Sequence, residues 1–380
     1  MKIRAMPMEN NKLSYLFLFL FIFIFLAITL KGLATIQPGD ENVYYYMGRL
    51  VSEGKVPYRD FFYAHPPLHI YLIALIYKIF GFKIIIFKSI PLISTLITAI
   101  FTFKIAKDKF GEPEAVISSL LFLFSYSVMF NSVFSFGVEF AAMLLVIGVY
   151  FITNKNNYCL AGIFFGFASI TRLLSLVPIF AVMALILFSN KKNFFKLSSI
   201  FFAVFLAANA FFSAFAGSSY LNSVYRYHLV KGIGGYENIR EYTDIIELNW
   251  ILFLPALSII FAKDKKPARL FAVISISYLL FLFALKKLFG FYFIMIFPFI
   301  AILSGYSIAN FYRHDIKRNF KILFFSILSL IFLWNLISDI IFLQSIGFVG
   351  FQRGNDLVEF INLNSDKKTM LFGDASVVPL

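Results

Sequence analysis

Long apolar runs recur along the whole chain and constrain its fold more than any other feature. The first run, residues 13–30, contains no charged side chain, and comparable runs follow up to residue 343. Of the 380 residues, 60% are hydrophobic and 53 are phenylalanine, which exceeds what the core of a soluble domain requires. The charged 14% cluster between the runs, because ionised groups are costly in hydrocarbon. We therefore expect an all-α integral membrane protein, a polytopic helical bundle.

The formal net charge of +14 has an ordinary explanation in such a bundle. Most Lys and Arg residues lie in short segments between apolar runs, where basic residues favour the cytoplasmic face. No RNA- or DNA-binding motif accompanies them, so we expect no nucleic-acid partner. Cys159 is the only cysteine, which excludes an internal disulfide. The first run is longer than the apolar part of a signal peptide, about 7–15 residues, and we expect it to remain as a span.

The basic clusters also orient the bundle. Those near Lys104, Lys191, Lys263 and Arg313 are expected in the cytoplasm, and the acid-bearing loops between them outside. Residues 67–80 are short for a span and would reverse this orientation by crossing, so we expect them along the outer membrane surface. About eleven transmembrane helices result, at residues 13–30, 84–103, 115–131, 138–153, 158–171, 173–189, 197–216, 249–262, 270–285, 291–311 and 320–343.

This topology divides the chain into a transmembrane domain, residues 1–343, and a short extracytoplasmic tail, residues 344–380. The first outer loop, 31–83, is expected to carry juxtamembrane helices and the active site. The second outer loop, 217–248, is rich in Tyr and in charges of both signs. The tail either packs on the membrane domain or is a truncated soluble domain, since its last stretch has too few residues to bury a core.

Two acids, Asp40 and Glu41, directly follow the first span. Acids at a helix start stabilise that helix, because carboxylates favour the positive end of its dipole. The alternative is a catalytic carboxylate that orients or deprotonates a hydroxyl or amide acceptor, with a pKa raised by partial burial. The density of polar groups around the pair favours this alternative, so both are candidate catalytic residues.

The same loop carries further polar and aromatic groups. Tyr44, Tyr45 and Tyr46 follow on the predicted helix, either as an aromatic belt at the membrane interface or as faces and hydroxyls that bind a sugar. Arg59 and Asp60 come later in the loop. We take Tyr44, Tyr45, Arg59 and Asp60 as candidate acceptor- or sugar-binding residues.

Cationic residues recur where an anion could bind. His65 precedes a Pro-Pro pair that suits a first helical turn, which aims it and the helix N-terminus at one point. Arg172 interrupts an apolar stretch at a predicted outer turn, and Lys286 and Lys287 precede a later span. Snorkelling to the interface explains such cations, and contact with a phosphate is the functional alternative.

Glu139 enters a predicted span from its outer side, where an acid is costly unless it is paired or functional. It is either an interfacial acid or a second carboxylate facing the same site. His65 and His69 lie four residues apart and could share a helix face. A zinc site would need further ligands, but there is no H-E-x-x-H motif and no cysteine partner, so we expect no metal.

Together these residues resemble the GT-C glycosyltransferases of the protein O-mannosyltransferase and lipid A aminoarabinose transferase type (glycosyltransferase family 39 and its relatives). The resemblance runs through DENVYYYMGRLVSEGKVPYRDFF and HPPLHIYLIALIYKIFG, and continues in FSFGVEFAAML, LAGIFFGFASITRLL and KKLFGFYFIMIFPFIAILSG. The first block is fairly specific, whereas the others count only in their order. The resemblance implies a GT-C-like bundle in the cell membrane with its active site on the extracytoplasmic side.

The resemblance also implies roles for single residues. The family's catalytic acid matches Asp40, which would act as general base with Glu41 beside it. Glu139 stands where the family more often has Asp, and His65 where it frequently has Lys, which makes a phosphate contact there pH-dependent. Arg172 matches the family's basic residue after a Gly-rich span.

The implied partners are a polyprenyl-phosphate-linked sugar donor, an acceptor glycan, lipid or protein, and membrane lipid. His65, Arg172, Lys286 and Lys287 would stabilise the lipid phosphate as it leaves. Other GT-C enzymes use a metal with an Asp-x-Asp motif, which this chain lacks, so no cofactor and no essential metal are expected.

Two other functions remain open on the sequence. A transporter or flippase for a lipid-linked sugar would also use charges in the membrane, but such proteins often consist of repeated halves with broken helices, and no repeat is evident here. A non-catalytic membrane scaffold is the second alternative, and it would be indifferent to the loss of the Asp40 carboxylate.

Overall fold

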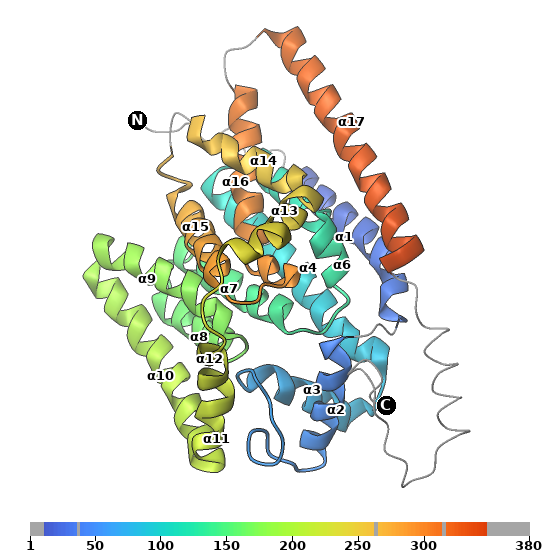
Figure 1. The fold of residues 1–380 in the computed structure, drawn as a ribbon. Coiled ribbons are helices and arrows are strands. Elements are labelled where there is room, and N and C mark those ends of the chain that lie inside the picture. Colours follow the sequence, from blue (N-terminus) through green and yellow to red (C-terminus); the bar gives the residue numbers. More distant parts are fainter. Residues whose placement is uncertain (1–10, 36–38, 262–264, 314–316, 348–380) are drawn as a thin grey trace.

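Every regular element in the described part of the chain is a helix or a helical turn (Figure 1). The structure is a computed structural model that describes residues 11–35, 39–261, 265–313 and 317–347. The all-α architecture expected from the apolar runs is therefore confirmed. The predicted tail lies outside the described residues from position 348 onward.

Seventeen α-helices follow one another within these ranges. The first nine are α1 (Asn11–Leu33), α2 (Asp40–Ser52), α3 (Leu68–Phe80), α4 (Ile84–Lys109), α5 (Glu112–Leu123), α6 (Tyr126–Asn131), α7 (Val138–Thr153), α8 (Tyr158–Ser169) and α9 (Leu176–Ser189). The others are α10 (Lys191–Ala216), α11 (Ser218–Leu221), α12 (Tyr227–Val230), α13 (Ile239–Leu248), α14 (Trp250–Leu257), α15 (Arg269–Ala284), α16 (Phe297–Arg313) and α17 (Arg318–Phe342). Short 3-10 or π-helical turns occur at Leu173–Ser175, Asn222–Arg226, Tyr236–Asn238, Ser258–Phe261, Gly290–Met295 and Leu343–Gly347.

Local chemistry explains several helix starts. The side chain of Asn157 accepts a hydrogen bond from the Leu160 amide at 3.0 Å before α8. Asn190 accepts one from the Asn193 amide at 3.0 Å before α10. Both satisfy amides that a first helical turn leaves without partners. Gly137 precedes α7 with a φ of 78°, a conformation that favours glycine.

Four helices are long and apolar enough to cross a bilayer alone, namely α1, α4, α10 and α17. The pair formed by Tyr236–Leu248 and Trp250–Ile260 also qualifies if counted as one span, although it bends by 92°. Shorter apolar helices include α3, α7, α8, α9 and α15. Each segment that was expected to cross is largely helical, but the number of crossings stays a prediction.

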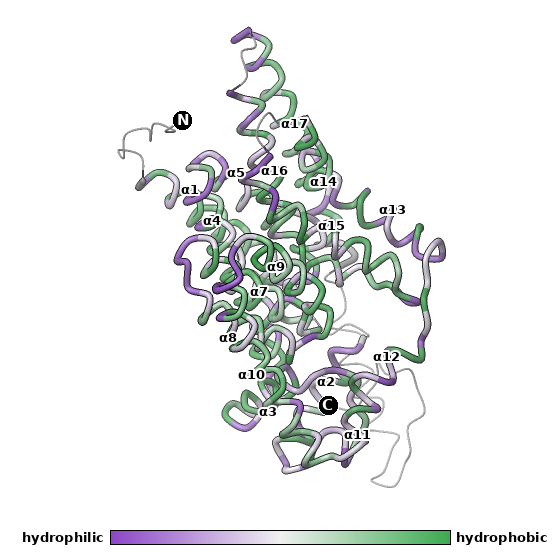
Figure 2. The backbone as a smooth tube through the Cα atoms, turned by 90° about the vertical axis from the view of Figure 1, so that its left-hand side faces the viewer, coloured by the Kyte–Doolittle hydropathy of each residue, from purple (hydrophilic) through white to green (hydrophobic). Residues whose placement is uncertain are grey.

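The longer helices pack side by side in a bundle (Figure 1). α5 packs between α4 and α16, and α7 packs against α4 and α8. α8 and α9 each pack on α10 at one side, and α9 also contacts α15. Figure 2 shows hydrophobic residues through the middle of this bundle and hydrophilic ones at helix ends and connections. α17 has no buried residue, and the turn that follows it is joined to α1 by Gln344, which donates to the Ile28 carbonyl at 2.9 Å.

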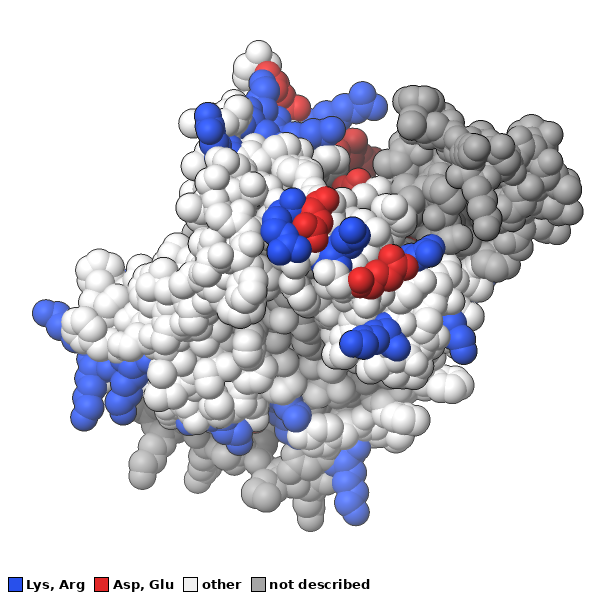
Figure 3. Space-filling model, turned by 90° about the horizontal axis from the view of Figure 1, so that it is seen from below, with Lys and Arg blue, Asp and Glu red and all other residues white. Residues whose placement is uncertain are grey.

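α2, α3, α11 and α12 lie together at one end of the molecule, which we call the loop end (Figure 1). α3 packs mainly against α2 rather than among the long helices, and its place along the membrane surface stays a prediction. The basic residues that end α4, start α10 and separate α16 from α17 lie at the opposite ends of these helices. Figure 3 views the loop end and shows separate basic patches, several with an acidic side chain beside them.

Candidate active site

The first turn of α2 carries two adjacent acids in opposite surroundings. Asp40 is exposed, whereas Glu41 is 1% exposed. Glu41 forms an ion pair with Lys88 of α4 at 3.0 Å, and it accepts hydrogen bonds from the Tyr45 hydroxyl at 3.0 Å and from the Ser135 amide at 3.1 Å. Glu41 thus joins α2 to α4 and to the segment before α7, and Asp40 is left as the accessible acid.

Lys88 was not foreseen as a site residue. It is 0% exposed, and its ammonium lies 4.6 Å from the ring centroid of Phe134. A buried cation is tolerated because a carboxylate and an aromatic face replace its lost hydration. The signal was present in the sequence, since a Lys inside a predicted span is by default a functional or paired residue.

Arg172 lies between α8 and the turn Leu173–Ser175 and is 3% exposed. Its guanidinium carbon is 5.5 Å from the ring centroid of Tyr44. Among the described residues, Nε and Nη2 of Arg172 have no hydrogen-bond partner. A buried guanidinium with unused donors is suited to a planar or tetrahedral anion.

Tyr44 and His65 lie beside this guanidinium, and the Asp40 carboxylate is within electrostatic reach of Tyr44. The Tyr44 hydroxyl and Nε2 of His65 are hydrogen-bonded at 2.9 Å. Burial raises the pKa of Tyr44, while the Arg172 guanidinium acts against this rise and the Asp40 carboxylate adds to it. Asp40, Arg172 and Tyr44 also interact electrostatically with Tyr292. We call these five residues, Asp40, Tyr44, His65, Arg172 and Tyr292, the Arg172 cluster.

His65 is held in place from three sides. Besides the bond to Tyr44, its carbonyl accepts a hydrogen bond from the Tyr58 hydroxyl at 2.8 Å. Its ring also stacks on the His228 ring, with 5.8 Å between the ring centroids. Burial, followed by the Arg172 guanidinium, holds the pKa of His65 well below its usual range. The imidazole is therefore neutral near pH 7 and offers a hydrogen bond to a ligand rather than a positive charge.

Glu139, in the first turn of α7, is 2% exposed. Neither of its carboxylate oxygens has a hydrogen-bond partner among the described residues, and it is within electrostatic reach of Arg172 and Glu41. Gly137, just before it, packs on the ring of His69, and His69 Nε2 lies 3.3 Å from the Ser135 hydroxyl. The structure thus places Glu139 within electrostatic reach of the Arg172 cluster, and its role in the site stays a prediction.

Other predicted site residues lie away from the Arg172 cluster. Tyr45 is fully buried, stacks on Phe87 and uses its hydroxyl on Glu41, so it packs the interior instead of lining a site. Arg59 and Asp60 pair with each other on an exposed turn. Lys286 is bound to Glu237 at 2.9 Å. The ammonium of Lys287 lies 5.0 Å from the Phe289 ring centroid. No described contact joins either lysine to Arg172.

The described residues contain no group of three or more His, Cys, Asp or Glu side chains that could hold a metal ion. His65 and His69 both approach Tyr44, with ring centroids 5.8 Å from it in each case, rather than converging on a common point. The expectation of a metal-independent site stays a prediction.

Comparisons with known proteins bear on this geometry. Residues 64–216 match the family described as dolichyl-phosphate-mannose-protein mannosyltransferase. The crystal structure of ArnT from Cupriavidus metallidurans bound to undecaprenyl phosphate matches with a TM-score of 0.72 and 12% identity, over 97% of this chain and 84% of that chain. The apo oligosaccharyltransferase of Archaeoglobus fulgidus matches with a TM-score of 0.67 and 13% identity, over 95% of this chain and 59% of that chain. No curated protein sequence matches the chain.

The chain has the GT-C fold. The resemblance to GT-C glycosyltransferases of the protein O-mannosyltransferase and aminoarabinose transferase type is thereby confirmed. Within this GT-C protein, the segment that matches the family includes His65, Glu139 and Arg172 and begins after Asp40 and Glu41. The assignment of Asp40 and Glu41 to the site therefore rests on the fold of α2 and on their contacts, not on the family match.

Proposed function

We propose that this GT-C protein is a membrane glycosyltransferase that moves a sugar from a polyprenyl-phosphate donor to an acceptor on the extracytoplasmic side, with Asp40 as general base. The observation that carries the proposal is the surroundings of Arg172. A buried guanidinium, two of whose nitrogen atoms have no hydrogen-bond partner among the described residues, belongs to the same cluster as an exposed carboxylate. One group suits an anionic leaving group, and the other suits an acceptor proton.

The comparisons support the class of reaction and donor. The family that matches residues 64–216 is described by its use of a lipid-phosphate sugar and a protein acceptor. The ArnT structure with the same fold holds undecaprenyl phosphate. A donor of this kind has an apolar tail for the bilayer and a phosphate for a cationic seat, which is the chemistry that Arg172 offers at the loop end of an apolar bundle.

The reaction follows from these two groups. The acceptor hydroxyl attacks the anomeric carbon while Asp40 takes its proton. The bond between the anomeric carbon and the phosphate oxygen breaks, and its electron pair leaves with the lipid phosphate. Arg172 stabilises the charge that grows on that phosphate, and the Tyr44 hydroxyl and neutral His65 contribute hydrogen bonds. Asp40 then releases its proton to solvent. No metal takes part in this scheme.

The test uses the purified full chain with radiolabelled polyprenyl-phosphate sugars and a membrane extract, and follows the label into lipid, glycan and protein. Asp40→Asn keeps the size of the side chain but cannot accept the proton, so we expect transfer to fall by at least about 100-fold. Glu53→Gln is the matched control, since Glu53 is an exposed acid directly after the same helix and, within the described ranges, forms an ion pair with Arg49 alone. It should transfer at the wild-type rate.

Two outcomes would overturn the proposal. Transfer by Asp40→Asn at the wild-type rate would remove Asp40 as the base. Movement of the intact lipid-linked sugar between the leaflets of a vesicle, without any transfer, would identify the chain as a flippase. Asp40→Asn should retain the melting temperature of the wild type, because the Asp40 side chain is exposed and its substitution disrupts no buried contacts.

A further inference from the structure

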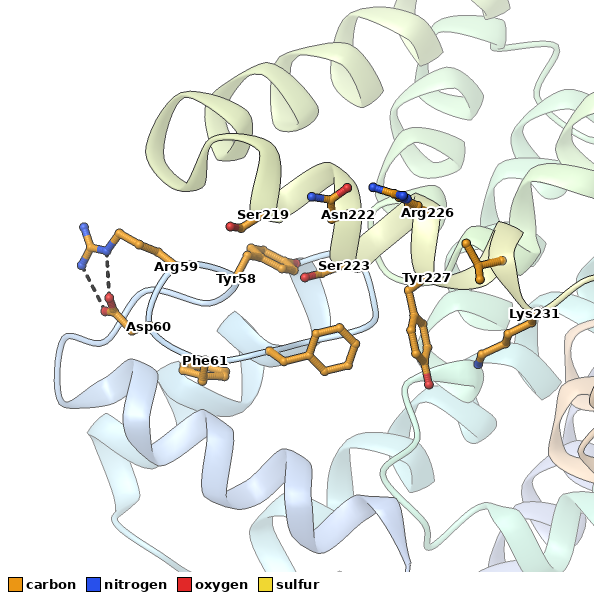
Figure 4. A pocket seen from close by; sticks show the side chains of 12 residues that line it. Tyr58, Arg59, Asp60, Phe61, Ser219, Asn222, Ser223, Arg226, Tyr227 and Lys231 are labelled. Atoms are coloured by element: carbon orange, nitrogen blue, oxygen red, sulfur yellow. Dashed lines mark hydrogen bonds and ion pairs between the residues drawn. The ribbon is translucent and has the colours of Figure 1, made fainter.

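Hollows of different character lie at opposite ends of the bundle. The groove shown in Figure 4, of about 780 Å³, lies at the loop end between residues 58–62 and 219–231, and charged and polar side chains form much of its lining. A smaller crevice of about 250 Å³ lies at the other end, between the start of α5, the end of α16 and the first turns of α17. We call it the α5–α16–α17 crevice.

The interior of the α5–α16–α17 crevice is apolar. Its lining comes from three helices, with Pro113 and Ile117 from α5, Ile308 and Ala309 from α16, and Phe325 from α17. A cavity of this size with apolar walls does not hold ordered water, because water finds no hydrogen-bond partners there, and it accepts apolar groups instead. In a membrane bundle the apolar groups at hand are the hydrocarbon chains of lipids.

Two exposed side chains of α16, Tyr312 and Arg313, complete the lining. Arg313 is fixed by its ion pair of 2.6 Å with the buried carboxylate of Glu114. The ammonium of Lys321, on α17, lies 5.4 Å from the Tyr312 ring centroid. The apolar crevice therefore ends in a phenol and two cations, as does a protein surface at the level of lipid headgroups.

α17 directs further positive charge to the crevice. Arg318 and Lys321 precede Phe325 by seven and four residues, which places the three side chains on one face of the helix. Phe325 lies against α16, with its ring centroid 5.4 Å from that of Tyr312. Neither Arg318 nor Lys321 forms an ion pair with any residue that the structure describes.

The local charge is positive even when every acid nearby is counted. Residues 313–321 include four Lys or Arg and one acid, Asp315, which lies outside the described residues. Glu114 adds a second acid, and it is paired with Arg313. An apolar crevice with an excess of cations at its mouth is complementary to a molecule that has a hydrocarbon chain and an anionic head.

We propose that the α5–α16–α17 crevice binds an anionic phospholipid of the leaflet that borders it, which the basic clusters predict to be the cytoplasmic one. One acyl chain fills the crevice and joins α17 to α5 and α16, and the phosphate lies at Arg318 and Lys321. A lipid-linked sugar donor is the poorer occupant, because the proposed seat of its phosphate, Arg172, lies toward the loop end. Binding of the phospholipid does not rest on the proposed glycosyl transfer.

The binding test uses the purified full chain, freed of lipid in an uncharged detergent, and counts bound molecules by native mass spectrometry. The probes are dioleoyl phosphatidylglycerol, dioleoyl phosphatidylcholine and glycerol 3-phosphate. The first two differ only in the headgroup, and the third is an anion without chains. We expect phosphatidylglycerol to bind at least about 10-fold more tightly than phosphatidylcholine, and glycerol 3-phosphate not to displace it. Phosphatidylglycerol should also raise the melting temperature, because it binds the folded chain.

The variant R318Q/K321Q should lose most of the preference for phosphatidylglycerol over phosphatidylcholine. The matched control is K191Q/K192Q, which removes two exposed lysines from the first turn of α10. That turn also starts a long apolar helix, but α10 lies on the other side of the bundle from α17 (Figure 1). The control should keep the wild-type preference.

A third variant tests the crevice instead of its charges. Ala309→Leu places a larger apolar side chain in the space that the acyl chain is expected to take. It should weaken phosphatidylglycerol at least about 5-fold and leave the melting temperature of the lipid-free protein unchanged or higher, because the added methyl groups fill empty volume. The glycerol 3-phosphate measurement tests the need for a chain without any variant.

Four results contradict the proposal. Equal affinity for the two phospholipids removes the recognition of charge, and displacement by glycerol 3-phosphate reduces the site to one for a free phosphate. An equal loss in R318Q/K321Q and K191Q/K192Q means that surface charge in general attracts the lipid. Displacement of phosphatidylglycerol by undecaprenyl phosphate in the wild type makes a polyprenyl phosphate the occupant of the crevice.

Discussion

Glu41 and Lys88 form an ion pair of which neither member reaches solvent. Taking both charges out of water is costly, and the pair is tolerated because Tyr45, Ser135 and the Phe134 ring surround it with donors and an aromatic face. The pair anchors the first turn of α2 to α4, and Asp40 directly precedes Glu41 in that turn. We infer that Glu41 positions the candidate base rather than reacting itself.

Removal of one member of the pair should therefore lower the free energy of unfolding more than removal of both. Glu41→Gln and Lys88→Met each leave an unpaired buried group and should each cost about 3–5 kcal/mol of the free energy of unfolding. The double variant should cost clearly less than the sum of the two. Reversible denaturation in detergent measures all three. Strictly additive effects would show that the two side chains do not interact in the folded protein.

The same variants report on positioning through kinetics. If the pair sets the place of Asp40, the double variant should recover stability but keep a low kcat, with an unchanged KM for the lipid donor. A double variant with wild-type kcat would reduce Glu41 and Lys88 to a stabilising contact without influence on Asp40.

His65, His69 and His228 should make the protein less stable in acid. Burial lowers the pKa of all three, that of His69 to about 3. In the unfolded chain they titrate near the ordinary value of about 6.5. Below that pH the unfolded chain takes up protons that the folded protein does not, so stability is present above about pH 6.5 and is lost as the pH falls toward the lowered values.

The free energy of unfolding should therefore decrease between pH 7.5 and pH 5, with a shallower slope in His65→Gln than in the wild type. Denaturation at several pH values measures both slopes. A stability that rises on acidification over this range would mean that these histidines are protonated in the folded protein.

At the scale of the elements, α5 and α16 approach each other closely at Gly305. A Cβ atom added there would lie 2.8 Å from the Glu114 carbonyl oxygen and 3.0 Å from the Ser118 amide nitrogen, and closer still to the Ser118 hydroxyl. The contacting groups include backbone atoms, which side-chain rotation cannot move away. Arg313 of α16 also pairs with the buried Glu114 at 2.6 Å, so the two helices are joined by charge as well as by contact.

Gly305→Ala should force these helices apart and lower stability by about 1–3 kcal/mol. Ser307→Ala on the same helix is the control, because it adds no volume and removes a buried hydroxyl that has no hydrogen-bond partner in the described part of the chain. Thermal unfolding of both variants measures the difference. Equal melting temperatures for the two variants would show that the interface between α5 and α16 accommodates an added methyl group without strain.

The helices were easier to predict from the sequence than the breaks within them. The apolar pattern predicted helix over residues 115–131 and 291–311, and both regions are largely helical. The first, however, is divided into α5 and α6, and the second starts with a 3-10 turn at Gly290–Met295 that brings Tyr292 to the Arg172 cluster. The period and length of an apolar pattern indicate a helix buried in lipid. A break within such a helix depends instead on which neighbouring groups bind the backbone N–H and C=O groups that the break leaves free.

At the scale of the whole molecule, the loop end is assembled from distant parts of the chain. Asp40 comes from the start of α2, Arg172 from the segment after α8, and His228 from the second outer loop. His228 binds the Ala64 carbonyl, and the pairing of Ile233 with Leu285 ties the second loop to the end of α15. The charges between the apolar runs and the lengths of those runs predicted that these loops share one side of the bundle. They did not predict which side chains are in contact.

The sequence by itself determined that the chain is a helical membrane bundle, where most helices run, and which loops carry the polar residues. These are local properties, because the energy of a side chain in hydrocarbon depends on its own chemistry. Only the tertiary structure decided that Asp40 is accessible while the neighbouring Glu41 is buried, that Lys88 is its partner, and that Lys286 and Lys287 lie away from Arg172. Burial and pairing depend on residues far apart in the chain, and their positions follow from how the helices pack.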